Sequence, residues 1–326
     1  MGVSQPCCNI SEYLGFPSNF IACKKEDSSA SSECIYSEIL ENKEFASPSE
    51  PMSPPIPSTV LDLLFDSTAF SELEEKLDPM PLLVSENSSE PPMPARGLPD
   101  GSVYKGQWDA VGRKHGRGIE IRPDGTKYNG LFRDGLPHGF GRLVKPNLEA
   151  FQGEFFEGRV NGQGTYITVS GVKYQGEWKN DLQHGKGTEI QSDGLIYEGY
   201  FVEGRKQGLG TFKWPDGSYY QGDVLNNSLH GKGTYVWEGR KSYSGEWVEG
   251  KMQGHGTFEW ADGRKYEGNF ENDEKNGDGV MVFPDGKKYE GGWKDGLQHG
   301  EGRVSRVLNG QIVTKRGVWT YGTRKD

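Results

Sequence analysis

Cysteine is absent from residues 101–326, tryptophan is absent from residues 1–100, and no long hydrophobic run occurs anywhere. A secreted repeat protein more often places cysteines where they staple the fold, so a reducing, intracellular location is favoured. No apolar stretch reaches the roughly 18–20 residues needed to span a bilayer. The N-terminus also lacks the apolar core of a signal peptide. We therefore expect an intracellular protein that is not secreted.

Glycine, proline and charge divide the chain near residue 97. The first hundred residues hold three of the 48 glycines but 13 of the 18 prolines, with 5 Lys+Arg against 17 Asp+Glu. The remainder carries 32 Lys+Arg against 30 Asp+Glu, so the net charge of −10 belongs to this first part. An acidic segment rich in Ser and Pro cannot bury enough apolar surface to offset its ordering entropy. We predict an acidic tail over 1–97, disordered over 1–57 and 78–100.

One part of the tail has helical periodicity. Its apolar residues predict an amphipathic helix over 58–77, stopped by Asp78-Pro79. Acidic amphipathic segments commonly fold upon binding, so this one could dock on the rest of the chain in cis or recruit a partner in trans. The residues of this partner helix are Leu61, Leu64, Phe65, Phe70, Leu73 and Leu77.

The first eight residues resemble a dual acylation signal. Gly2 with adjacent Cys7 and Cys8 suggests a myristoyl–palmitoyl anchor, which would supply the two signals that stable membrane anchoring needs. Pro6 stands where the myristoylation pattern has Ser or Thr, which argues against it. Acylation remains a hypothesis.

From residue 104 onward the same pattern of landmark residues recurs nine times. An opening aromatic is followed by Gly at +2, an aromatic at +4, a His-Gly or Gln-Gly pair, Gly at +13 and an Asp-Gly turn. A fixed short period indicates supersecondary units that need their neighbours for burial. The opening residues are Tyr104, Tyr128, Phe151, Tyr174, Tyr197, Tyr220, Tyr243, Tyr266 and Tyr289.

The spacing within a repeat predicts two antiparallel strands. Positions 0, +2 and +4 share one face of a strand, as +13, +15 and +17 do in a second, while the opposite parity is polar. Asp-Gly pairs such as Asp193-Gly194 are strong hairpin signals, and an eight-residue segment is expected to connect the two strands. Because glycine weakens a strand interior, the recurring glycines indicate that aromatic rings lie over them. At about 4.8 Å between strands, roughly eighteen strands would form a rod or trough about 90 Å long.

This pattern, with Y-x-G-x-W, H-G-x-G and D-G in register, resembles the MORN (membrane occupation and recognition nexus) repeat. The resemblance covers about residues 103–302 and implies an all-β fold: an elongated, single-layer antiparallel meander over 98–326. Register is least certain where Asn147-Leu148, Gly239-Arg240 and Asn309-Gly310 replace Asp-Gly. The resemblance further implies a non-enzymatic platform associated with the membrane–cytoskeleton boundary, cilia or flagella, or phosphoinositide kinases.

Two surfaces are candidate binding sites. If the aromatic face is partly open, it is an apolar trough in which a partner helix or peptide could lie; alternatively, the rings are consumed in packing one another. Its candidate residues are Tyr174, Trp178, Trp214, Trp247, Trp260 and Trp293. The second surface is the basic end Arg303, Arg306, Lys315, Arg316, Arg324 and Lys325.

Three interpretations of the basic end stay open. It could be a charged edge that deters aggregation, an anion site for a phosphoinositide or an acidic protein, or a dock for the acidic tail. Elsewhere on the polar face, lysines interleaved with acids favour cross-strand pairs over a broad lipid surface.

Catalytic and metal motifs are not found. The histidines recur at repeat spacing, about 10–20 Å apart at strand spacing, whereas metal ligands converge on one ion; we interpret them as turn-bracing residues. The glycine runs lack the spacing of a phosphate loop. We expect a non-enzymatic scaffold for protein partners, with no cofactor and no nucleic acid. The alternatives are a phosphoinositide-binding recruitment module or a regulatory subunit of a separate enzyme. An exposed terminal strand would also allow a homodimer.

Overall fold

The computed structural model describes residues 75–80 and 94–325, and in these residues all regular structure is β. Their strands divide between two compact units, described separately below. The described part of the N-terminal unit is 75–80 with 94–204, and that of the C-terminal unit is 205–325. The predicted all-β meander is confirmed.

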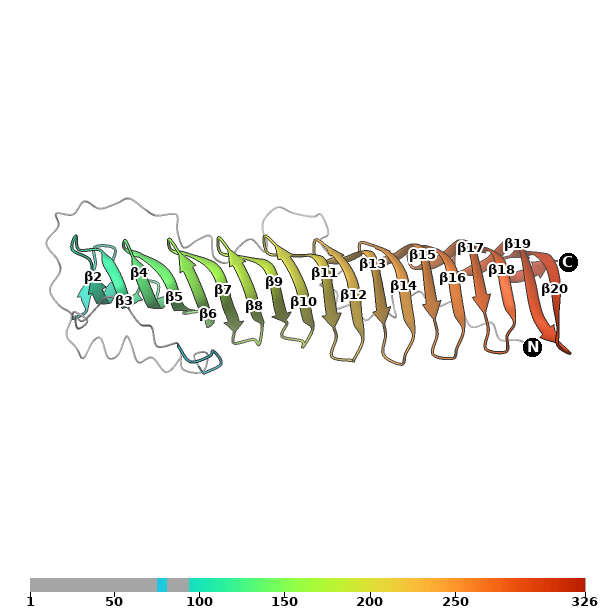
Figure 1. Ribbon diagram of the computed structural model, residues 1–326, viewed down its shortest axis with the longest axis horizontal. Helices are drawn as coiled ribbons and strands as arrows, with labels where there is room; N and C mark the ends of the chain where they lie inside the picture. Colours follow the sequence, from blue (N-terminus) through green and yellow to red (C-terminus); the bar gives the residue numbers. More distant parts are fainter. Residues whose placement is uncertain (1–74, 81–93, 326) are drawn as a thin grey trace. The chain divides into compact units, whose positions relative to one another are not determined.

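In the N-terminal unit each strand pairs antiparallel with the next along the chain (Figure 1). The strands are β1 (Arg96–Gly97), β2 (Val103–Trp108), β3 (Lys114–Ile121), β4 (Lys127–Arg133), β5 (Leu136–Lys145), β6 (Glu149–Phe156), β7 (Arg159–Thr168), β8 (Lys173–Lys179), β9 (Leu182–Ile190) and β10 (Ile196–Val202).

The C-terminal unit is a second run of antiparallel neighbours. Its strands are β11 (Arg205–Lys213), β12 (Tyr219–Leu225), β13 (Ser228–Val236), β14 (Ser242–Val248), β15 (Lys251–Glu259), β16 (Lys265–Glu271), β17 (Glu274–Val282), β18 (Lys288–Lys294), β19 (Leu297–Leu308), β20 (Gln311–Thr320) and β21 (Thr323–Lys325).

Glycines face each other across every one of these repeat strands. In the C-terminal unit, for example, Gly222 pairs with Gly233, which in turn pairs with Gly245. The ring of Tyr220 lies over Gly222 and Gly233, where an added Cβ would collide with it. The prediction that rings lie over glycines is therefore confirmed.

The aromatic face is the core of both units. The nine opening aromatics are at most 1% exposed. Each packs edge-to-face against the +4 aromatic of its own repeat or the next; the Tyr174 ring, for instance, lies 5.0 Å from both Trp178 and Phe201. This geometry is favoured by the aromatic quadrupole. A single row of rings thus takes the place of a second layer.

Two kinds of turn alternate along the chain. The Asp-Gly turns form as predicted: Gly194 has φ +88°, and Asp193 Oδ1 accepts the N–H of Leu195. Register is also kept at the replaced turns, where Lys145 pairs with Glu149 around Asn147-Leu148.

The eight-residue connection was predicted wrongly. It contains a two-residue turn, such as Asn180-Asp181 with φ of +49° and +69°, after which β9 begins directly. Asn and Asp tolerate this left-handed conformation, which a two-residue hairpin requires.

The tail predictions are tested only at its described residues. Residues 75–77 form a turn and bend, so the helix does not extend to Leu77 as predicted. Disorder over 78–100 is wrong for Arg96–Gly97, which pair with β2. The remaining tail candidates, Gly2, Cys7, Cys8, Leu61, Leu64, Phe65, Phe70 and Leu73, lie outside the described residues.

Candidate functional site

An open groove crosses the polar face of the C-terminal unit from β15 to β20. Its volume is about 1140 Å³, and it is lined in part by the glycine pairs of β16 to β20. Because the absent Cβ atoms of these glycines would point toward the aromatic face, only backbone lies beneath the groove. The side chains on either side of each glycine form two walls.

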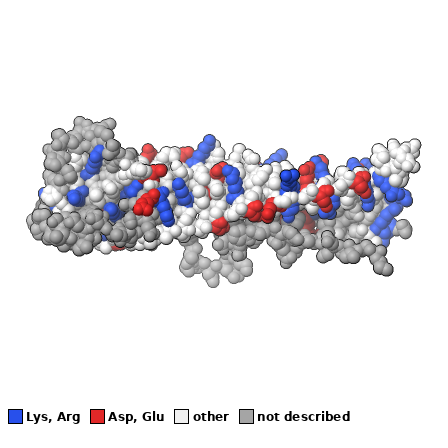
Figure 2. Space-filling view, turned by 90° about the horizontal axis from the view of Figure 1, so that it is seen from below, with Lys and Arg blue, Asp and Glu red and all other residues white. Residues whose placement is uncertain are grey.

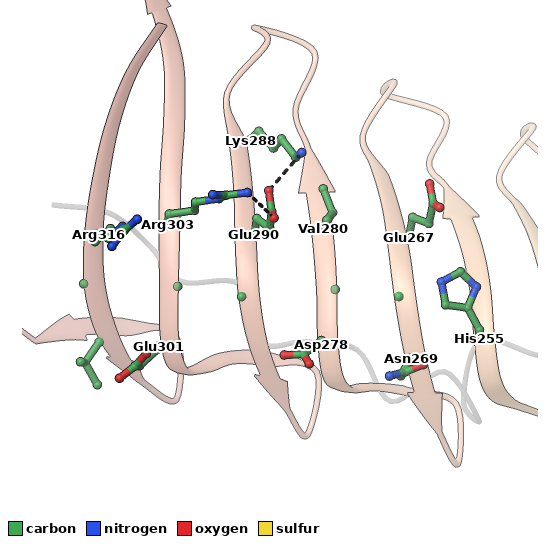
Figure 3. A pocket seen from close by; sticks show the side chains of 16 residues that line it. His255, Glu267, Asn269, Asp278, Val280, Lys288, Glu290, Glu301, Arg303 and Arg316 are labelled. Atoms are coloured by element: carbon green, nitrogen blue, oxygen red, sulfur yellow. Dashed lines mark hydrogen bonds and ion pairs between the residues drawn. The ribbon is translucent and has the colours of Figure 1, made fainter.

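The two walls differ in charge (Figure 3). Lys288, Glu290, Arg303 and Arg316 lie on one side of the glycines. On the other side lie Asn269, Asp278 and Glu301. The groove therefore offers both positively and negatively charged side chains to a molecule lying across the strands.

Glu290 is the most strongly paired residue of the groove. Its carboxylate accepts from Arg303 Nη2 at 2.5 Å and contacts Lys288 Nζ at 3.2 Å. These hydrogen bonds, that of Arg303 foremost, hold the pKa of Glu290 below its usual range. Arg316 lies directly across from Arg303, and no acid among the described residues pairs with its side chain. The groove thus ends at an uncompensated positive charge.

The predicted aromatic trough is not open. Tyr174, Trp178, Trp247 and Trp293 are at most 6% exposed, which leaves them no surface for a partner. Of the six candidates, only Trp214 and Trp260 are half-buried. The alternative in which rings are consumed in packing therefore holds for these four.

The predicted basic end is gathered on the last three strands. Arg306, Lys315, Arg316, Arg324 and Lys325 are all exposed, as is Arg303. Figure 2 shows basic and acidic side chains interleaved over most of one face, and basic ones gathered at the end where Figure 1 draws the last strands. Across β19 and β20, Arg303 pairs with Arg316, and Val304 with Lys315. Successive pairs face opposite sides of the sheet, so the basic residues divide between its two faces.

Sequence reasoning missed the apolar tip of the β19–β20 hairpin. Val307 and its cross-strand partner Ile312 are 61% and 75% exposed. They were missed because β19 and β20 extend beyond the repeated pattern. In this extension no regularly spaced aromatic residues show which face of the strand a residue is on.

Comparison with known proteins identifies the repeats. The MORN repeat family profile matches nine segments that together cover more than half of the chain: 104–127, 128–148, 151–173, 174–196, 197–219, 220–239, 243–263, 266–288 and 289–305. The chain belongs to the MORN repeat family.

The similarities to individual proteins are short or weak. A 57-residue stretch, 18% of this chain, is 39% identical to Alsin from Homo sapiens and from Mus musculus; it spans 3% of either relative. The SAS-4 TCP domain of Drosophila melanogaster, solved with a proline-rich motif of Ana2, aligns with 65% of this chain and 94% of its own. Its identity is 12% and its TM-score 0.25. Streptogramin B lyase aligns at 12% identity and a TM-score of 0.13, covering 70% and 79%.

The MORN histidines are spread along the strands. Among residues 75–80 and 94–325, no three His, Cys, Asp or Glu side chains come together as a metal site. His299 Nδ1 accepts the backbone N–H of Tyr321 at 3.5 Å, and it is the one histidine of the described residues with a side-chain hydrogen bond of the predicted turn-bracing kind. Within the same ranges no helix could cross a membrane.

Proposed function

We propose that this MORN protein is a non-catalytic scaffold that binds protein partners, working at a membrane–cytoskeleton boundary or in a cilium or flagellum. The observation that carries the proposal is the groove across β15 to β20. Its volume of about 1140 Å³ exceeds the roughly 300–1,000 Å³ of small-molecule sites. Charges of both signs line an open path over several strands, which suits an extended polypeptide.

The shifted pKa values support a structural use of the buried polar groups. Burial raises the pKa of the opening tyrosines, whose hydroxyls donate to backbone carbonyls; Tyr220, for example, donates to the Asp223 carbonyl at 2.8 Å. Burial also raises the pKa of Asp181 and Asp273, which accept backbone N–H groups. Catalytic groups with shifted pKa values would instead cluster in a cleft.

Charge reversal at Arg316 tests the scaffold proposal. Lys315 is the matched control, because it neighbours Arg316 in β20 but its side chain leaves the opposite face. The full chain would carry a C-terminal proximity-labelling enzyme in cells. We expect Arg316→Glu to lose partners that Lys315→Glu keeps. Identical partner sets for wild type and Arg316→Glu would refute binding through the groove.

Recruitment to anionic phospholipid is the second candidate. It is favoured by the exposed Val307 and Ile312 at the hairpin tip, which could enter a bilayer while the basic residues of both faces, Arg316 on the same face and Lys315 on the other, meet headgroups. If this second candidate is right, the protein should float together with vesicles that contain phosphoinositide at physiological salt. Both Lys315→Glu and Arg316→Glu should weaken flotation, and alanine at Arg303, Arg306, Lys315 and Arg316 together should abolish it. Failure of the wild type to float would exclude it.

A further inference from the structure

A short piece of the acidic tail is seated on the polar face of the N-terminal unit. Leu77 is only 6% exposed and packs against Val144, Ala150 and Ile167, with Leu148 beside them. Val144 and Ile167 are the cross-strand neighbours of Ala150 on β5 and β7. The leucine thus covers an apolar spot on a face that is polar elsewhere.

The backbone after Leu77 is held as firmly as the side chain. The Asp78 carbonyl accepts from Arg142 Nη2 at 2.8 Å and from Gln152 Nε2 at 3.0 Å. Arg142 Nε also donates to Gln152 Oε1 at 2.7 Å, which orients both side chains. The Asp78 side chain and Pro79 remain exposed. The site therefore binds a leucine side chain and the backbone carbonyl of the residue that follows it.

Ala150 is the smallest residue at its position in the nine repeats. In four repeats the residue before the opening aromatic is lysine, whereas the repeat that opens at Phe151 has Ala150 there. A lysine would place a long charged side chain where Leu77 lies, and alanine leaves the space that the leucine fills. The four lysines are Lys127, Lys173, Lys265 and Lys288.

We propose that the face of β5–β7 around Ala150 is a recognition site for a short peptide with a leucine next to a turn. The chain's own residues 75–80 occupy the site until a partner segment of the same chemistry displaces them. In peptide recognition, hydrogen bonds to the main chain give affinity and a pocket for a side chain gives specificity. This site and the groove of Figure 3 lie in different units, and neither proposal depends on the other.

Tryptic cleavage of the full chain after Lys76 measures how often the segment leaves the site. Cleavage requires an open segment, so its rate follows the population of the undocked form. Ala150→Lys should raise that rate by about tenfold or more. Ser242→Lys is the matched control, since it creates a lysine at the same repeat position in a repeat away from Leu77. Its rate should equal that of the wild type.

Displacement is tested in the same assay with a synthetic peptide of residues 72–83 carrying Lys76→Gln. Tethering gives the native segment a high effective concentration, so the peptide is needed at about 1 mM. It should accelerate cleavage of the wild-type chain, and the same peptide with Leu77→Asp should not. An unchanged rate in Ala150→Lys, or no effect of the peptide, would overturn the proposal. If trypsin also cleaves Ala150→Lys at position 150, that variant has an unfolded sheet. Leu77→Asp in the full chain then replaces it, because this change removes the leucine and leaves the sheet intact.

Discussion

At the scale of the residue, tyrosine and glycine are useful only together. Each opening ring except that of Tyr197 covers two glycines on adjacent strands, and each tyrosine hydroxyl donates to the carbonyl three residues on. The ring needs the glycines for space, and the glycines need the ring to exclude water from their backbone. Mutations on the two sides of this contact are therefore expected to have different costs.

Loss of one hydroxyl should be mild. Tyr220→Phe removes the 2.8 Å bond to the Asp223 carbonyl and should lower the free energy of unfolding by about 0.5–1.5 kcal/mol. The chain contains the control, because Phe151 opens a repeat without a hydroxyl; Phe151→Tyr should be neutral or stabilising. Urea titrations followed by tryptophan fluorescence would measure both. Equal stability of Tyr220→Phe and wild type would show that the bond contributes nothing.

Addition of one methyl group should be more severe. In Gly222→Ala the new Cβ would lie 2.5 Å from the Tyr220 hydroxyl and from the Lys232 carbonyl. Overpacking of this kind costs about 1–3 kcal/mol or more. Gly286→Ala separates clash from backbone strain, since Gly286 has φ +78° but nothing within 4 Å of an added Cβ. Gly222→Ala should have a midpoint temperature of thermal unfolding well below that of Gly286→Ala. The reverse order would contradict the explanation by overpacking.

At the scale of the element, the two-residue turns also join one repeat to the next. Asp181, Asn227 and Asp273 each accept, through Oδ1, a backbone N–H of the preceding repeat at 2.8 Å. The backbone N–H of each returns a bond to the same residue. A turn that ends one hairpin thus fixes the position of its neighbour.

Substitutions of Asp273 test this bond between repeats, and Asn227 shows which residue can replace the aspartate. Asp273→Ala leaves the buried Met252 N–H without its acceptor and should destabilise by about 1–3 kcal/mol. Asp273→Asn keeps the acceptor, as Asn227 does, and removes the charge. Burial raises the pKa of Asp273 above 3.8, so its ionised form is penalised in the folded state at neutral pH.

The pH dependence follows from that direction. The penalty is full above the raised folded pKa and is relieved as pH falls from that value toward 3.8. Asp273→Asn should therefore be more stable than wild type at pH 7, with the difference shrinking on acidification. Denaturant midpoints at several pH values would measure it. A difference that grows on acidification would be inconsistent with the burial account.

At the scale of the whole molecule, the buried phenols should make the protein sensitive to alkali. Burial raises the pKa of Tyr197 and Tyr235 to about 12, and that of Tyr128 and Tyr220 further in the same direction. A raised folded pKa stabilises the protein fully below the unfolded value of 10.0, and this contribution is lost as pH rises through the folded pKa. Stability should fall steeply above pH 10. Phenolate absorbance should rise together with unfolding; phenolate formation in a sheet that stays folded would disprove the coupling.

The sequence predicted which strands pair better than it predicted which residues on their faces are open to a partner. Two-residue spacing and Asp-Gly pairs were sufficient for the ring-over-glycine packing, because both are local consequences of backbone geometry. Asn180-Asp181 was not recognised as a turn, since a polar pair inside a long connection has no period of its own.

The surfaces depend on contacts that a one-dimensional pattern does not carry. Tyr174 and Trp247 are buried by rings from neighbouring repeats, so their availability to a partner could not be judged from one repeat. The Leu77 site joins residues more than sixty positions apart. Its one local signal was an alanine at a position where other repeats have lysine.

The side-chain bond between repeats recurs at every second repeat, at positions 181, 227 and 273. The repeats on either side of these have an acid followed by glycine in this turn, at Gly158, Gly204, Gly250 and Gly296, whose backbone N–H alone bonds backward. The repeat that opens at Tyr128 also has such a turn, at Gly135, so the alternation begins with the repeat that opens at Phe151. From Phe151 onward, the structural unit is accordingly a pair of repeats. Duplication or loss of one repeat would bring two turns of the same kind side by side, whereas a change by two preserves the alternation. Shortened versions that lack two adjacent repeats of this stretch should therefore be more stable than versions that lack one.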